Sequence, residues 1–181
     1  MRRILIIAIT LALMPFIAVE PARAVEQIAG ASARFKVAEI VQPKADTRAF
    51  KLRTYLESHQ SPLAPYAPLF IKKADEYQLP DWKLVPAIAG VESTFGKAIP
   101  TDSYNAYGWA NGNFAFKNWE ESIDIVTKTL KTNYLDKGAD TIEKIARIYA
   151  PPSQTWAQHV HFFMNKIDLF KPLDTRLALS L

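Results

Sequence analysis

Helical periodicity, broken at intervals by proline and glycine, is the feature that most constrains how this chain folds. Between about residues 49 and 170, apolar side chains recur three and four positions apart, the spacing that gives a helix one buried face. The breaks are SPLAPYAP at 61–68, Gly96 and the prolines at 151–152, where a helix does not readily continue. The sequence shows no run of alternating polar and apolar residues. It therefore predicts a mostly α chain with one domain over about 49–170.

The loop at 97–117 separates the predicted helices into two groups. Asn111-Gly112 is a favourable turn dipeptide, and WANGNFAF around it predicts a small β-hairpin. Residues 25–48 have mixed polarity and no sustained period, so we interpret them as a linker, and 171–181 as a short tail. The predicted helices begin near 49 and cover about 66–78, 81–96, 119–130, 140–149 and 155–167.

The first residues are typical of an export signal. Met1-Arg2-Arg3 is basic, Ile4–Val19 is a run of 16 residues without a charge, and Ala22-Arg23-Ala24 fits a cleavage site. We therefore predict a signal peptide at 1–24 and an exported protein in the cell wall or periplasm. The alternative is an uncleaved N-terminal anchor, which would be the protein's only attachment to the membrane.

Composition excludes several classes of protein. Hydrophobic residues make up 49% of the 181 positions, which is enough for a packed core. Cysteine is absent, so a disulfide framework, a cysteine nucleophile and a cysteine-based zinc site are excluded. Without residues 1–24 the chain keeps 19 basic and 17 acidic side chains, a net charge of +2 that suits a polyanionic cell wall. No basic stripe predicts nucleic-acid binding.

One carboxylate lies on an apolar helix face. In LPDWKLVPAIAGVESTFG, Glu92 shares helical spacing with Val85, Ile88, Ala89 and Phe95. Burial disfavours an ionised carboxyl group and raises its pKa, which would let Glu92 donate a proton near neutral pH. The alternative is that Glu92 lies at the edge of this face and only forms a cap or an ion pair.

The loop after this helix is rich in aromatic and amide side chains. Rings that stack on the apolar faces of sugars, together with amides that bind hydroxyl and acetamido groups, would suit a polysaccharide. We expect Tyr107 and Trp109 to face substrate; the alternative is that the rings fill a small core under the loop. The aromatic residues are Tyr104, Tyr107, Trp109, Phe114 and Phe116, and the amides are Asn105, Asn111 and Asn113.

Three blocks of the sequence resemble the lysozyme-like superfamily, in matching order. AIAGVESTFGK is similar to its acid-bearing helix, where a Glu-Ser pair follows an apolar stretch. SYNAYGWANGNFAFKNWEESIDIVTKTL and IYAPPSQTWAQHVHFFMNKI resemble the loop and the closing block of bacterial endo-β-N-acetylglucosaminidases. The resemblance covers about residues 66–168 and implies one lysozyme-like helical domain that cleaves N-acetylated glycans such as peptidoglycan.

The resemblance also implies roles for individual residues. Glu92 matches the catalytic acid, Ser93 the residue beside it, and Tyr149 a tyrosine that lies in the cleft near the acid. The floor of the cleft is matched by Asn105, Tyr107 and Gly108. Tyr104 and Trp109 flank this loop as further substrate-binding residues. Lytic transglycosylases usually carry a Gly-Leu-Met-Gln loop, which is replaced here by Ala-Tyr-Gly-Trp, so hydrolysis and transglycosylation both stay open.

A second catalytic carboxylate is not evident. Asp102 lies in the loop, where an Asx-turn is an equally good interpretation. Solvation on the polar face of a helix explains three further acids, Glu120, Glu121 and Asp124. A substrate that supplies its own N-acetyl nucleophile needs only one protein acid.

Other chemistry is not indicated. His159 and His161 are two residues apart and do not share a helix face, and no G-x-S-x-G motif occurs. We therefore expect a monomeric glycan-cleaving enzyme without metal or cofactor. Two alternatives are a module that binds glycan without cutting it and a structural partner in an envelope complex, in which the rings would form a protein interface.

Overall fold

The computed structural model describes residues 46–172. The predicted signal peptide, most of the predicted linker and most of the predicted tail lie outside the described residues. Helix α1 begins at Thr47, where Asp46 accepts a hydrogen bond from the N–H of Arg48 as N-cap, so the last predicted linker residues belong to this helix.

The described residues are mostly helical, which confirms the predicted class. Short 3-10 or π turns connect or extend the α-helices, and no helix within residues 46–172 is long and apolar enough to cross a bilayer. The α-helices are α1 (Thr47–Ser58), α2 (Ala67–Glu76), α3 (Leu84–Ser93), α4 (Trp119–Thr129), α5 (Ile142–Tyr149) and α6 (Trp156–Leu169). The short turns are η1 (Ala64–Tyr66), η2 (Trp109–Gly112), η3 (Leu130–Tyr134) and η4 (Leu135–Lys137).

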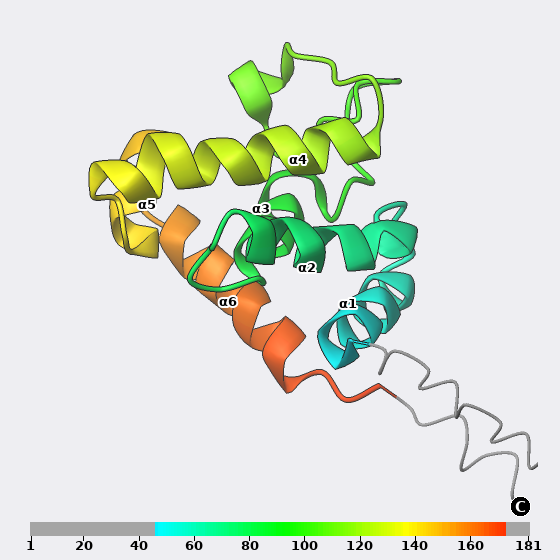
Figure 1. Cartoon of the computed structure of the whole chain (residues 1–181). Helices are drawn as coiled ribbons and strands as arrows, with labels where there is room; N and C mark the ends of the chain where they lie inside the picture. The colour runs from blue at the N-terminus through cyan, green and yellow to red at the C-terminus, as the bar shows by residue number, and fades with distance from the viewer. Residues whose placement is uncertain (1–45, 173–181) are drawn as a thin grey trace, which may run out of the picture. The chain divides into compact units, whose positions relative to one another are not determined.

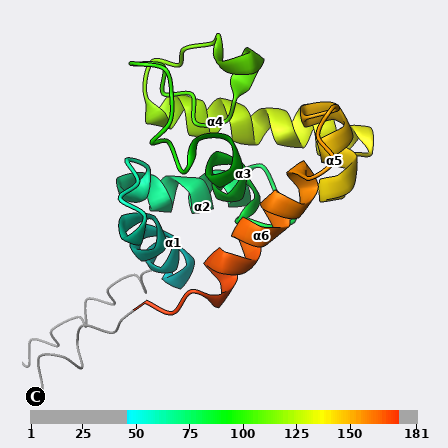
Figure 2. The same cartoon turned by 180° about the vertical axis from the view of Figure 1, so that it is seen from behind.

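Helix α3 lies at the centre of the domain, with the other helices around it (Figure 1). It packs against α6 and α4, while α2 packs against α1 and α4 and α5 packs against α6. Seen from behind, α6 runs from below α5 down to the side of α1 (Figure 2). Every side chain from Leu84 to Gly90 is buried, so α3 is covered on all sides and not on one face alone. A polar side chain on this helix is therefore costly unless its environment provides for it.

The β-hairpin predicted in the aromatic loop is wrong, since no strand occurs within residues 46–172. Residues 109–112 form the turn η2, with Ala110 and Asn111 in the left-handed region at φ 51° and 53°. The flanking segments do not pair because the side chain of Asn105 satisfies their backbone groups. Its Nδ2 donates to the carbonyls of Trp109 and Phe114, both at 2.9 Å, and its Oδ1 accepts the N–H of Trp109 at 2.9 Å.

Candidate active site

Glu92 lies in the last turn of α3, where the helix ends abruptly. Thr94, Phe95 and Gly96 follow in the left-handed region, with φ of 52°, 60° and 79°. Ser93 fastens this end: its hydroxyl donates to the carbonyl of Ala106 and accepts the N–H of Gly96, each at 2.8 Å. The helix terminus and the aromatic loop are therefore joined directly beside the acid.

The carboxyl group of Glu92 has a different neighbour at each oxygen. Nε1 of Trp156 donates a hydrogen bond to Oε1 at 2.7 Å. On the other side, a Cβ atom placed on Gly108 would lie only 2.6 Å from Oε2, and Gly108 has φ +64°. Glycine is therefore required there both by the close approach and by the backbone conformation. Burial raises the pKa of Glu92, and the hydrogen bond from Trp156 opposes that rise.

Tyr149 closes the site from the end of α5. Its ring stacks on Trp156, with centroids 5.0 Å apart and planes 28° from parallel. Its hydroxyl donates to the carbonyl of Tyr107 at 2.5 Å. Burial, with a smaller contribution from the charge of Glu92, holds the pKa of Tyr149 well above its usual range, so the hydroxyl stays neutral and remains a donor.

A depression of about 200 Å³ opens next to these residues. Gly108 connects the depression with Glu92, because it lies against the Glu92 carboxyl group and also lines the depression. Tyr134, from the π turn η3, forms part of the wall with its ring centroid 6.1 Å from that of Tyr149. The lining residues are Gly108, Trp109, Ala110, Asn111, Tyr134 and Tyr149. Rings and one amide therefore surround a space beside the carboxyl group of Glu92.

Tyr107 does not face this depression, contrary to the expectation that its ring stacks on a sugar. Its side chain is fully buried, and its hydroxyl oxygen has no hydrogen-bond partner among the described residues. The ring packs in the core instead, which is the alternative that the sequence left open. Only the backbone of Tyr107 contributes to the site, through the carbonyl that Tyr149 binds.

Three further predicted substrate contacts have structural roles. Ser93 and Asn105 are buried, and their polar atoms are used inside the protein to hold the loop as described above. Tyr104 is half-buried and packs its ring edge-on against Trp119, with centroids 5.3 Å apart. Trp109 is half-buried and does line the depression. Of the predicted side chains, Glu92, Trp109 and Tyr149 are thus brought together.

The candidates for a second carboxylate are engaged elsewhere or lie in solvent. Asp124 pairs with Lys73 at 2.6 Å, and Glu121 accepts the N–H of Lys117 at 2.6 Å, next to the start of α4. Asp102 and Glu120 are exposed. Within residues 46–172, no group of three or more His, Asp and Glu side chains could hold a metal ion.

Sequence reasoning missed two residues of the site. Trp156 lies in the last predicted helix, where its spacing indicates only a core position, and it is 4% exposed. A buried tryptophan N–H usually finds an acceptor, and that rule was the available signal. Tyr134 was not singled out, because nothing in the sequence indicates that the helix beginning at Trp119 continues as a π turn that brings its ring beside Tyr149.

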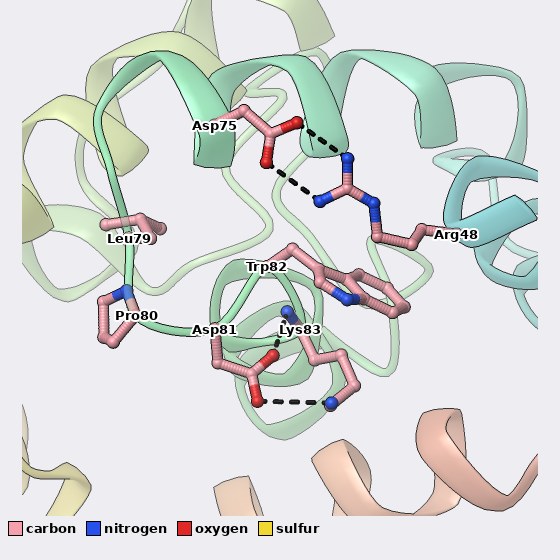
Figure 3. A pocket seen from close by; sticks show the side chains of 7 residues that line it. All are labelled: Arg48, Asp75, Leu79, Pro80, Asp81, Trp82 and Lys83. Carbon is pink, nitrogen blue, oxygen red and sulfur yellow. Dashed lines mark hydrogen bonds and ion pairs between the residues drawn. The ribbon is translucent and has the colours of Figure 1, made fainter. Parts of the chain in front are cut away.

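A second depression, of about 320 Å³, lies at the opposite end of α3. Figure 3 shows that its charged side chains face one another. Arg48 binds both oxygens of Asp75, at 2.9 and 2.7 Å, and Lys83 pairs with Asp81 at 3.2 Å beside the ring of Trp82. Arg48 lowers the pKa of Asp75. Asp75 is therefore held ionised and is a poor proton donor at neutral pH, and Asp81 is engaged in an ion pair.

The arrangement around Glu92 is suited to general acid chemistry. A carboxyl group that has a raised pKa, adjoins an open space and has no ion-pair partner within residues 46–172 is the kind of group that can act as a general acid. Comparison of the chain with protein-family models and with curated proteins found no match.

Proposed function

We propose that this chain is an exported glycan hydrolase with a lysozyme-like domain, which cleaves β-1,4 bonds between N-acetylated sugars in peptidoglycan-type polymers. The observation that carries the proposal is the lone carboxyl group of Glu92, bound to Trp156 at 2.7 Å beside a depression lined by Trp109, Tyr134 and Tyr149. The residue pattern that resembles the glucosaminidases supports the same class of substrate.

Glu92 acts as the general acid in this proposal. It gives its proton to the glycosidic oxygen as the bond from that oxygen to the anomeric carbon breaks. The carbonyl oxygen of the sugar's own acetamido group forms a bond to the anomeric carbon, so no second protein carboxylate is needed. The carboxylate of Glu92 then takes a proton from water, whose oxygen attacks the anomeric carbon and releases the acetamido group.

The aromatic residues bind and shield the sugars. Trp109 and Tyr134 offer ring faces on the wall of the depression, on which the apolar faces of sugars can stack. Tyr149 holds the carbonyl of Tyr107 and thereby the backbone that leads into Gly108. It also excludes water from one side of the acid by stacking on Trp156.

The decisive experiment compares Glu92→Gln with the wild type on purified peptidoglycan. Glutamine keeps the shape and an acceptor for Trp156 but has no proton to give, so cleavage should fall by about 10² to 10⁴-fold. Asp102→Asn, the same chemical change at an exposed acid of the loop, is the matched control and should keep full activity. Normal cleavage by a folded Glu92→Gln variant would overturn the proposal.

Mass spectrometry of the products identifies the bond that is cut. The proposal expects reducing-end N-acetylglucosamine. Reducing-end N-acetylmuramic acid would indicate a muramidase, and an anhydro-muramyl end would indicate a lytic transglycosylase, in which the sugar's own hydroxyl replaces water. Retention on insoluble peptidoglycan without any product would instead favour a binding module.

A further inference from the structure

We propose that Trp156 is a positioning residue that gives the two oxygens of Glu92 unequal roles: Oε1 accepts the indole N–H, and Oε2 holds the proton and delivers it on the side of Gly108. The reaction in which the proton is used rests on the proposed function. The assignment of the two oxygens does not, because it concerns the protein without substrate.

The hydrogen bond between Trp156 and Glu92 has only one possible direction. The indole Nε1 is a donor only, and it lies 2.7 Å from Oε1. A protonated carboxyl group has one hydroxyl oxygen and one carbonyl oxygen, and the carbonyl oxygen is the better acceptor. A donor fixed at Oε1 therefore favours the form in which the proton resides on Oε2.

Oε2 lies in a different environment from Oε1. Its close neighbour is Gly108, where even a Cβ atom would come within 2.6 Å. Gly108 presents no side chain there, and it also lines the depression of about 200 Å³. The proton on Oε2 is thus next to the proposed sugar site, whereas Oε1 is covered by a buried indole.

The donor is held rigidly. The backbone N–H of Trp156, at the start of α6, donates to the hydroxyl of Ser153 at 3.1 Å. The indole ring of Trp156 is stacked on Tyr149. Tyr149 in turn binds the carbonyl of Tyr107, directly before Gly108. Oε1 of Glu92 is therefore held by the indole, and the backbone of Gly108 beside Oε2 is placed by contacts that continue through Tyr149.

Glu92 has one titratable neighbour in this set. The phenol of Tyr149 feels its charge and stays neutral, since its pKa lies well above the usual range. The indole of Trp156 from α6 and the backbone of Gly108 from the loop carry no charge. Loss of the N–H would raise the pKa of Glu92, whereas better hydration after loss of the indole would lower it, so a rise in this pKa after substitution of Trp156 is attributable to the lost N–H.

The test uses Trp156→Phe in the full chain, which keeps a ring to stack on Tyr149 but removes the donor. Loss of the indole N–H removes more stabilisation from the ionised form of Glu92 than from the neutral form, which raises the pKa of Glu92. The basic limb of the pH–rate profile on peptidoglycan should therefore move to higher pH. We expect kcat to fall by about 10- to 100-fold with little change in KM, because the acid is no longer held in place. Trp119→Phe, at another buried tryptophan whose ring packs on Tyr104, should leave the basic limb unmoved.

A second measurement does not depend on cleavage. The side-chain carboxyl carbon of Glu92, followed by NMR in the substrate-free protein, should titrate at a higher pH in Trp156→Phe than in the wild type. In the wild type the indole N–H signal of Trp156 should shift with the same midpoint, and this shift should vanish in Glu92→Gln. That comparison requires no substitution of Trp156, so it stands even if Trp156→Phe does not fold.

The outcomes separate the two proposals. Equal carboxyl midpoints in wild type and Trp156→Phe, or an indole signal that ignores the titration of Glu92, would overturn the role of Trp156 while leaving the glycan hydrolase intact. Full cleavage by Glu92→Gln with the expected NMR shifts would overturn Glu92 as the general acid of the proposed reaction, while the assignment of the oxygens stands.

Discussion

The two ends of α3 show opposite ways of accommodating carboxyl groups beside one buried helix. At its N-terminal end, Asp75 and Asp81 are paired with Arg48 and Lys83, and the pKa of Asp75 is lowered (Figure 3). At its C-terminal end, Glu92 has an indole N–H and a glycine for neighbours, and its pKa is raised. The side chains are chemically alike, so the difference lies in the partners that the fold supplies.

The two ends of α3 differ in how readily their carboxyl groups can donate a proton. The larger depression lies at the paired end, where Arg48 lowers the pKa of Asp75 and holds it as an anion. The smaller depression adjoins the unpaired acid, which desolvation keeps closer to protonation. Size alone would select the paired end, whereas electrostatics favours Glu92 as the proton donor of the proposed reaction.

The largest effect on folding stability is expected from filling the space beside Glu92. In Gly108→Ala the new methyl group would lie 2.6 Å from Oε2 of Glu92, so the carboxyl group or the loop has to move. We expect cleavage of peptidoglycan to drop at least tenfold and the free energy of unfolding to fall by about 1–3 kcal/mol from overpacking. Denaturant unfolding and the cleavage assay measure the two effects.

Gly112→Ala is the matched control for this substitution. Gly112 lies in the same loop at φ +81°, but a Cβ atom there would meet nothing within 4 Å. It should show only the cost of the left-handed backbone, about 1–2 kcal/mol, and keep its activity. Equal losses of activity in both variants would mean that backbone strain, and not contact with Glu92, explains the first result.

A smaller effect on folding stability is expected when Glu92 is replaced by a side chain that is always neutral. The folded pKa of Glu92 is raised above its ordinary value of 4.5, so the wild type loses stability as the pH rises through the folded value. Glu92→Gln avoids that loss and should have a Tm higher by about 2–4 °C at pH 7. The advantage should disappear below about pH 4, where both side chains are neutral. A Tm difference that does not vary with pH would contradict the raised pKa.

The smallest effect on folding stability is expected at the paired end, the N-terminal end of α3. The ion pair of Arg48 with Asp75 spans 2.7 Å, with side chains 37% and 56% exposed, so solvent screens it. Asp75→Asn should cost about 0.2–1 kcal/mol, less at high salt, without changing cleavage. Because the pKa of Asp75 is lowered, this difference should be present above its ordinary value of 3.8 and fade as the pH falls through the folded value. Asp102→Asn controls for the change in net charge.

The sequence predicts the helices well because their periodicity is local. Helical spacing in the sequence places Trp119, Ile123, Val126 and Leu130 on one inward face, and all four are buried; Glu92 is singled out by the same kind of spacing. The loop was predicted poorly because Asn105 satisfies backbone groups on both sides of the turn, and side-chain bonds of this kind leave no periodic signal. For the same reason Tyr107 was expected to face substrate although it lies in the core.

The contact between Glu92 and Trp156 joins residues 64 positions apart and therefore sets an order of assembly during synthesis. Among the described helices, α6 is the last to be made, and it begins with the indole that binds the acid. A nascent chain halted before this point carries Glu92 without its donor and without the ring on which Tyr149 stacks. For the proposed glycan hydrolase, this geometry means that the acid is oriented only once the domain is nearly complete.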